Sequence, residues 1–198
     1  MDPLIPPLLH FWFSPSTGGP TRWFAPSPTF DAAIASSFLP LIKRARDTAT
    51  LDGWTQHPQG TLALLLVLDQ FPRNVFRGTR EAYASDAKAL EIATVGVAKG
   101  QDREVELSRR MFFYLPFMHN ETLLAQVACV ALYEALLAEA VVDGEEEVVE
   151  GAKRGVEMAE RHRDVVGRFG RFPSRNGVLG RESTGEEEGF LGERPGGF

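Results

Sequence analysis

The placement of proline and glycine constrains the fold of this 198-residue chain more than any other feature. Seven of the 13 prolines lie in the first 30 residues, and nine of the 19 glycines lie beyond residue 166. Because both residues interrupt regular structure, long helices are confined to the segment between these ends. The pattern predicts a single helical domain over 1–198, with a proline-rich segment at 1–29 and an arginine- and glycine-rich segment at 167–198 packed on the same domain.

Apolar residues in the middle of the chain recur at the three- and four-residue spacing of helices, and no convincing pair of strands is present. Pro72 is expected to end the most apolar helix, whereas Thr79 and Asn120 are expected to cap the helices that follow them. The fold class is therefore all-α, an antiparallel array of about seven to eight helices. These are expected at 8–12, 30–48, 58–70, 79–99, 104–115, 121–137 and 145–166, with a short final helix opened by a capping box at Thr184.

Composition narrows the class of partner. The net charge is −6, whereas a domain built to bind nucleic acid is usually basic, so no nucleic-acid partner is expected. The longest apolar run, from Leu62 to Leu68, is too short to cross a bilayer, and the start of the chain lacks the basic residues of a signal peptide. The single cysteine, Cys129, has apolar neighbours and is expected to be a buried, inert thiol. We therefore expect a soluble, cytoplasmic protein without a membrane partner.

The first segment that could carry chemistry closes the most apolar helix. It contains Asp69, Gln70, Arg73 and Asn74. A carboxylate at such a place is costly unless it is paired, and Arg73 follows Asp69 by one helical turn. One interpretation is an ion pair that fixes the helix end. The other places both side chains at the mouth of a pocket.

The second segment, 114–121, is a turn that contains His119 and Glu121. Histidine titrates near neutral pH and a carboxylate can orient it, so His119 is a candidate acid or base. The alternative is a histidine that bonds a backbone carbonyl in a tight turn. The metal-binding patterns Glu-x-x-His and His-Glu-x-x-His are absent, and no metal site is predicted. The phosphate loop, the dinucleotide fingerprint and the Gly-x-Ser-x-Gly elbow are absent as well, so the sequence identifies no cofactor.

The third segment, 161–181, holds six arginines, no lysine and a local net charge of about +5 on an acidic chain. Arginine suits planar, bidentate recognition of carboxylate or phosphate. The segment therefore predicts an anion-binding pocket or, equally, a loop held by ion pairs, with the acidic stretch 143–150 as one counter-charge. Its candidate ligand-binding residues are His162, Arg168, Arg171, Arg175 and Asn176.

Three motifs in this order resemble one known family. They are Leu-Asp-Gln-Phe-Pro-Arg-Asn at 68–74, Tyr-Leu-Pro-Phe-Met-His at 114–119, and the run that joins Arg161-His162-Arg163 to Arg168-Phe169-Gly170-Arg171-Phe172-Pro173 and to Leu-Gly-Arg-Glu-Ser-Thr at 179–184. The chain is similar over nearly its whole length to the family catalogued as domain of unknown function 924, from bacteria and fungi. The resemblance implies an all-α, tetratricopeptide-like superhelix and no established activity.

This chain departs from the family pattern at two polar positions. Asn120 stands where the family usually has serine, and Ser174 stands where it usually has histidine. A mechanism that required a histidine at 174 would be impossible here, whereas an arginine-lined anion site is less affected.

Two functions of different classes follow. In the first, a pocket binds a small anionic ligand through Arg73, Asn74 and the third segment, and His119, Glu121 and Asp69 are the candidate catalytic groups. In the second, a helical scaffold without catalysis binds an acidic peptide along an open groove. Motifs that converge in one cavity favour the first function. The sequence predicts no oligomeric state.

Overall fold

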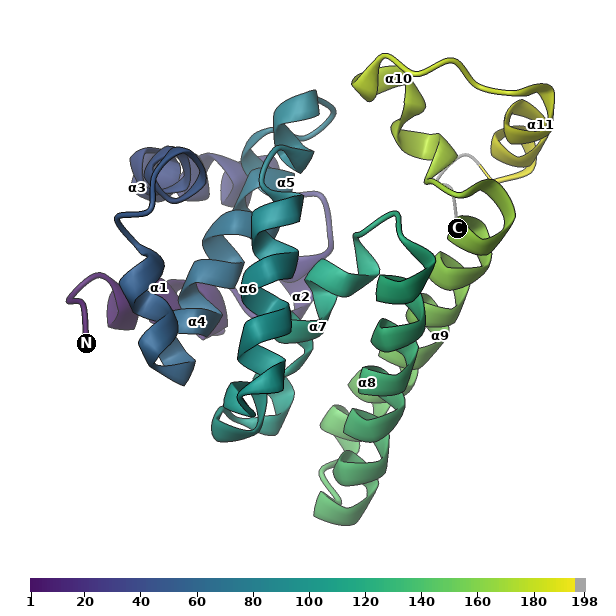
Figure 1. The fold of residues 1–198 in the computed structure, drawn as a ribbon. Coiled ribbons are helices and arrows are strands. Elements are labelled where there is room, and N and C mark those ends of the chain that lie inside the picture. The colour runs from purple at the N-terminus through teal and green to yellow at the C-terminus, as the bar shows by residue number, and fades with distance from the viewer. Residues whose placement is uncertain (195–198) are drawn as a thin grey trace. The chain divides into compact units, whose positions relative to one another are not determined.

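The computed structural model describes residues 1–194 and divides the chain into two compact units, Met1–Val105 and Glu106–Phe198. Every regular element among the described residues is helical, which confirms the all-α fold class (Figure 1). The last four residues of the segment predicted at 167–198 lie outside the described part.

The N-terminal unit is built from six α-helices linked by short helical turns. Trp12 has no exposed surface and stacks on Trp23 at 6.3 Å, while Phe71 packs against it from a later helix at 5.5 Å. Aromatic residues from the proline-rich start of the chain therefore close the core of this unit. Its elements are α1 (Ile5–Phe13), α2 (Pro20–Trp23), α3 (Pro28–Asp47), η1 (Asp52–Gln56), α4 (Pro58–Leu65), η2 (Leu66–Gln70), α5 (Phe71–Val75), η3 (Arg80–Tyr83), α6 (Asp86–Ala98) and η4 (Gln101–Glu104).

The C-terminal unit is organised by a hairpin of two long helices, α8 and α9, which run antiparallel in Figure 1. At their contact, a Cβ atom on Gly155 would lie 2.3 Å from the Tyr133 ring, so the glycine lets the helices approach closely. The elements of this unit are η5 (Leu107–Arg109), α7 (Met111–Met118), α8 (Leu123–Asp143), α9 (Glu146–Phe169), η6 (Pro173–Arg175), α10 (Asn176–Leu179) and α11 (Gly185–Glu193).

Two prolines do not end helices where the sequence predicts it. Pro72 lies in the first turn of α5, directly after the wide π-helical turn η2. A first-turn residue needs no intrahelical N–H bond, so the helical path continues through it. Pro116 lies inside α7, whose residues from Phe112 to Met118 are all buried, and this burial offsets the lost hydrogen bond.

Helix starts also differ from their predicted positions. Thr122, not Asn120, caps α8 by accepting from the Ala125 amide, whereas Asn120 accepts from the amide and the hydroxyl of Thr122. The helix expected from Thr79 begins only at Asp86, because η3 forms first and Ser85 donates to the carbonyl of Leu68 at 2.6 Å. The proline-rich segment at 1–29 also contains the short helix α2, for which no helix was predicted. The capping box at Thr184 is confirmed.

The helix α8 is long and apolar enough to span a bilayer by length and composition, with a mean hydropathy of 1.6 over its most apolar window. A helix that packs in the core of a soluble protein can meet the same test, and 39% of that window is buried. The finding gives no location for the protein.

Candidate functional site

The first motif forms a cluster around the buried carboxylate of Asp69. The side chain of Asp69 is 1% exposed, and Arg73 lies 3.1 Å from one of its oxygens. Arg73 also donates to the Asp69 carbonyl at 2.8 Å and to both oxygens of Asp86 at 3.0 Å. The Asp69–Arg73 ion pair expected on one interpretation is therefore present. The guanidinium carbon of Arg73 also lies 5.7 Å from the centre of the Tyr83 ring.

The neighbours of this pair are also bonded within the N-terminal unit. Gln70 donates to the second Asp69 oxygen at 2.5 Å, and Asn74 donates to Asp31 on α3 at 2.7 Å. The charge of Arg73 is maintained in this environment: burial opposes it, but Asp69 and Asp86 outweigh that effect and raise the pKa of Arg73. The wide turn η2 places Asp69 and Gln70 in the core, and such turns are frequent at functional sites.

The second and third motifs meet in the C-terminal unit. Arg181 donates to both oxygens of Glu121, at 2.7 and 3.0 Å, and the Phe172 amide donates to the same carboxylate at 2.8 Å. Burial alone would raise the pKa of Glu121, but the bonds from Arg181 and Phe172 outweigh it and lower that pKa. Glu121 is thus an ionised anchor for the segment that follows α9.

A second ion pair fixes the end of the same segment. Arg171 donates to the two oxygens of Glu187 at 2.7 and 2.8 Å, and Asn176 and the Thr184 amide donate to Glu187 as well. The bond from Arg171 is the largest of the causes that lower the pKa of Glu187 to about 2. The acidic stretch 143–150 lies at the opposite end of the 24-residue helix α9. Glu121, Glu186 and Glu187, rather than that stretch, therefore supply the counter-charges.

Three guanidinium groups lie over the rings of one aromatic cluster, formed by Phe169, Phe172 and Phe190. The Arg175 guanidinium carbon is 4.5 Å from the centre of Phe172, and that of Arg168 is 4.7 Å from the centre of Phe169. Arg194 lies 5.8 Å from the centre of Phe190. Arg168 also pairs with Glu186 at 2.8 Å, and both side chains of that pair are more than half exposed.

The two histidines of the predicted site differ in surroundings. His162 is buried on α9, with its ring 5.4 Å from that of Phe172, and its Nδ1 donates to the carbonyl of Met158 at 2.8 Å. Because a carbonyl oxygen can only accept, this bond places a proton on Nδ1. His119 is half-buried at the C-terminal end of α7, and its amide donates to the Leu115 carbonyl at 2.9 Å.

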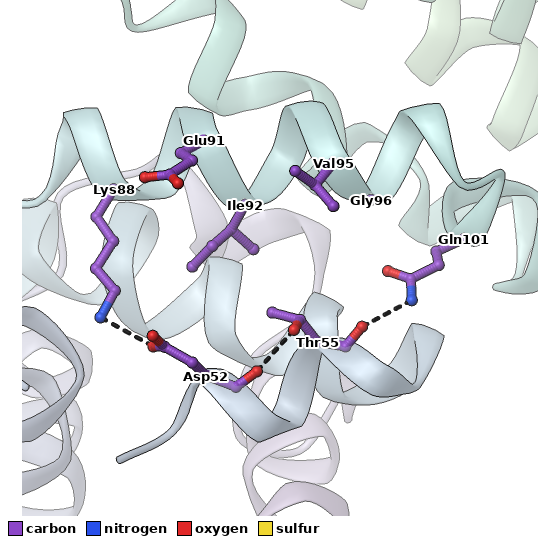
Figure 2. A pocket seen from close by; sticks show the side chains of 8 residues that line it. All are labelled: Asp52, Thr55, Lys88, Glu91, Ile92, Val95, Gly96 and Gln101. Atoms are coloured by element: carbon purple, nitrogen blue, oxygen red, sulfur yellow. Dashed lines mark hydrogen bonds and ion pairs between the residues drawn. The ribbon is translucent and has the colours of Figure 1, made fainter. Parts of the chain in front are cut away.

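The cavity drawn in Figure 2 lies in the N-terminal unit and does not contain the predicted site residues. It occupies about 190 Å³ between η1 and α6, below the roughly 300 Å³ at which ligand pockets begin. Lys88 crosses one end of it to Asp52 at 3.0 Å. Its lining residues are Asp52, Thr55, Lys88, Glu91, Ile92, Val95, Gly96 and Gln101.

Within residues 1–194, no group of three or more histidine, cysteine, aspartate or glutamate side chains could hold a metal ion. Cys129 is buried, as expected, and burial raises the pKa of its thiol to about 12.

The predicted site residues are divided between the two units. Asp69, Arg73 and Asn74 belong to the N-terminal unit, and the other seven to the C-terminal unit. Sequence reasoning did not select Asp86, Arg181, Glu187 or Arg194. Arg181 falls inside the arginine-rich span and Glu187 belongs to the capping box at Thr184, so both could have been selected, whereas a single acidic residue such as Asp86 carries no signal of its own.

The sequence matches the family described as bacterial protein of unknown function (DUF924) over residues 8–195. The fold is similar to a solved structure titled "Structure of Protein of Unknown Function ATU0120 from Agrobacterium tumefaciens". The two sequences are 40% identical, the alignment covers 96% of this chain and 97% of that one, and the TM-score is 0.82. No protein with a curated description matches the sequence.

Proposed function

This chain belongs to the DUF924 family of bacterial proteins of unknown function, and we propose that it binds a small anionic ligand, a carboxylate or a phosphate, at the arginine-rich end of its C-terminal unit. One observation carries the proposal: the guanidinium groups of Arg168, Arg175 and Arg194 lie on the rings of one aromatic cluster. A guanidinium that lies over an aromatic ring is restrained by that contact and still has N–H groups that can donate to an anion.

The arginines of this segment divide into two roles by their exposure. The pairs Arg171–Glu187 and Arg181–Glu121 each join a partly exposed guanidinium to a carboxylate that is buried or partly buried. They hold the backbone of 171–187 in place. The pair Arg168–Glu186 is exposed on both sides and contributes little to stability, so a ligand anion can take the place of Glu186 at low cost. Arg168 and Arg175 are therefore the ligand contacts, and Arg171 and Arg181 are positioning residues.

His162 belongs to this site because its ring lies against Phe172, the ring beneath Arg175. Catalysis by His119, Glu121 and Asp69 stays a prediction of the sequence, as does the tetratricopeptide-like character of the fold. The ionised state of Glu121 and its bonds to Arg181 and Phe172 favour a positioning role for that carboxylate.

The test is native mass spectrometry of gently purified protein, followed by titration with inorganic phosphate and with succinate. We expect a retained anionic molecule or a saturable rise in melting temperature with one of the two probes. Replacing Arg168 and Arg175 by alanine should remove it, whereas Arg103→Ala, an exposed arginine of the N-terminal unit, should not. A bare protein that responds to neither probe, but binds an acidic peptide, would contradict the proposal and support the scaffold function instead.

A further inference from the structure

Within the C-terminal unit, one face of α8 is an apolar surface that no described element of that unit covers. Leu124 is 82% exposed and Val142 is 86% exposed, at opposite ends of the helix. The buried side of α8 packs against α7 and α9: Cys129 donates to the carbonyl of Tyr114 on α7, and the Tyr133 ring lies against Gly155 on α9. Exposed apolar surface of this extent on a helix is typical of an interaction site. The other exposed residues of this face are Leu123, Val127, Ala131, Glu134, Ala135, Ala138 and Val141.

We propose that this face joins two copies of the chain, whose α8 helices pack side by side in antiparallel orientation. The central stripe of the face consists of Leu124, Ala128, Ala131, Ala135, Ala138 and Val142. Its residues follow one another at alternating steps of four and three, which is the spacing of helices that pack along a common line.

The order of these steps is the same in both directions along the helix, and this symmetry favours an antiparallel pair of identical helices. With the midpoint of contact at position 133, Leu124 of one copy faces Val142 of the other. Ala131 then faces Ala135, and Ala128 faces Ala138. A twofold interface requires such self-complementarity, because each patch must fit its own copy.

The sizes of the side chains fit the same arrangement. Alanine occupies the middle of the stripe, so the two helix backbones can approach closely there. The large residues at the ends fill the space beyond the alanines, and on one flank Val127 of one copy faces Val141 of the other. Both valines are more than half exposed in the single chain.

Charge selects the antiparallel orientation over the parallel one. Five acidic residues follow closely at the C-terminal end of α8: Asp143, Glu145, Glu146, Glu147 and Glu150. A parallel pair would bring two of these acidic ends together, which costs free energy. An antiparallel pair separates them and places each beside the N-terminal end of the other α8, where the helix dipole favours negative charge.

The size of the contact indicates a weak dimer. A 21-residue helix is about 31 Å long and about 10 Å wide, so the footprint on each copy is roughly 300 Å². This is less than the roughly 800 Å² that each partner of a stable complex buries, so we expect a weak, reversible dimer. Glu134 lies next to the midpoint on the flank, and two copies of it come close together, which weakens the pair further.

Sedimentation of the full chain from micromolar to near-millimolar concentration tests the dimer. We expect a reversible monomer–dimer equilibrium whose dissociation constant rises about tenfold in Ala135→Glu, because a charge is buried at the contact. The matched control is Ala87→Glu, at an exposed alanine of α6, and circular dichroism should show that both variants are folded. Glu134→Gln should tighten the dimer about twofold, because a like-charge pair is removed. A chain that stays monomeric over this range would overturn the proposal.

Disulfide trapping tests the orientation. We expect a mixture of Leu124→Cys and Val142→Cys chains to form a crosslinked heterodimer, because these positions face each other across the contact. Leu124→Cys alone should not crosslink, because its two copies would lie about 27 Å apart along the helix axis. Crosslinking of Leu124→Cys alone would overturn the antiparallel arrangement.

A lipid membrane is the alternative binding partner for this face. Co-sedimentation with phosphatidylcholine vesicles that contain phosphatidylglycerol distinguishes the two. We expect the acidic chain to stay in the supernatant. Vesicle binding that Leu124→Glu abolishes would overturn the proposal in favour of a lipid surface.

Discussion

In the N-terminal unit, Arg73 and its two carboxylates, Asp69 and Asp86, lie close together in the sequence and meet at the edge of a helical core. In the C-terminal unit, Arg181 and Glu121 are 60 residues apart and meet because the chain returns to the turn before α8. The first arrangement fixes charges at the edge of the large apolar core of the N-terminal unit. The second uses charges to hold a segment that has only a small core of its own.

The small core of that segment is visible in its apolar contacts. Val165, Val166, Phe172 and Phe190 form its buried cluster, with Phe169 and Leu191 packed against it. The N-terminal unit instead buries an unbroken run of apolar residues from Leu62 to Leu68. Loss of an ion-pair partner is therefore expected to have different consequences in the two units. In the N-terminal unit it leaves a buried charge, whereas in the C-terminal unit it releases the segment that follows α9.

The largest effect is expected from Asp69→Ala in the N-terminal unit. The substitution leaves the buried guanidinium of Arg73 with one carboxylate instead of two, so we expect the free energy of unfolding to fall by about 3 kcal/mol. Urea unfolding followed by tryptophan fluorescence measures it, because Trp12, Trp23 and Trp54 all lie in this unit. Asp47→Ala, which breaks the exposed Arg46–Asp47 pair, is the control and should change little. Equal effects of the two variants would contradict the stabilising role of the buried Asp69–Arg73 pair.

A smaller effect is expected from Arg181→Ala in the C-terminal unit. Glu121 would keep only its bond from the Phe172 amide, so we expect a loss of about 1 kcal/mol, since the pair is partly exposed. Hydrogen exchange should quicken at residues 171–190, while protection of α3 and α4 is unchanged. Arg168→Ala breaks a more exposed pair and serves as the matched control. Faster exchange in the N-terminal unit would contradict the local role of this pair.

The smallest effect is on the pH dependence of the C-terminal segment. Because the pKa of Glu187 is about 2 in the folded chain, below its usual 4.5, the ionised carboxylate stabilises the fold above pH 4.5. That stabilisation is lost as the pH falls from 4.5 toward 2. In Glu187→Gln, we expect hydrogen exchange of α11 to be faster at neutral pH and to vary less across this window. A pH dependence of α11 that is unchanged in the variant would show that another group controls it.

The sequence predicted features that depend on neighbouring residues better than those that depend on distant ones. The capping box at Thr184 needs only four consecutive residues, and the Asp69–Arg73 pair needs one helical turn, so both could be predicted. The turn η2 could not, because a run of buried apolar residues looks alike in α- and π-helices. The sequence therefore predicts a helix end at Pro72, where the structure has the first turn of α5.

The prediction of the polar site was limited in the same way, because its ion pairs join residues that are distant in the sequence. Arginine density alone marked the segment 161–181, but the pairing of Arg171 with Glu187 depends on the return of α11 after α10. The acidic stretch 143–150 is one counter-charge that the sequence suggests, but it lies at the other end of the long helix α9, whereas Glu186 and Glu187, which pair with Arg168 and Arg171, follow the segment closely. The exposed face of α8 was also missed, because its alanines read as helix formers without showing which side faces the solvent.

The measurement that tests the proposed function most directly is a titration of the full chain with inorganic phosphate, followed by NMR of the arginine Nε–H groups. We predict saturable shifts for Arg168 and Arg175, because their guanidinium groups contact the ligand, and much smaller shifts for Arg171 and Arg181, because Glu187 and Glu121 hold them. Repeating the titration with succinate distinguishes phosphate from carboxylate as the preferred group. Uniform, non-saturating shifts of all four arginines with both anions would contradict a binding site at this end of the C-terminal unit.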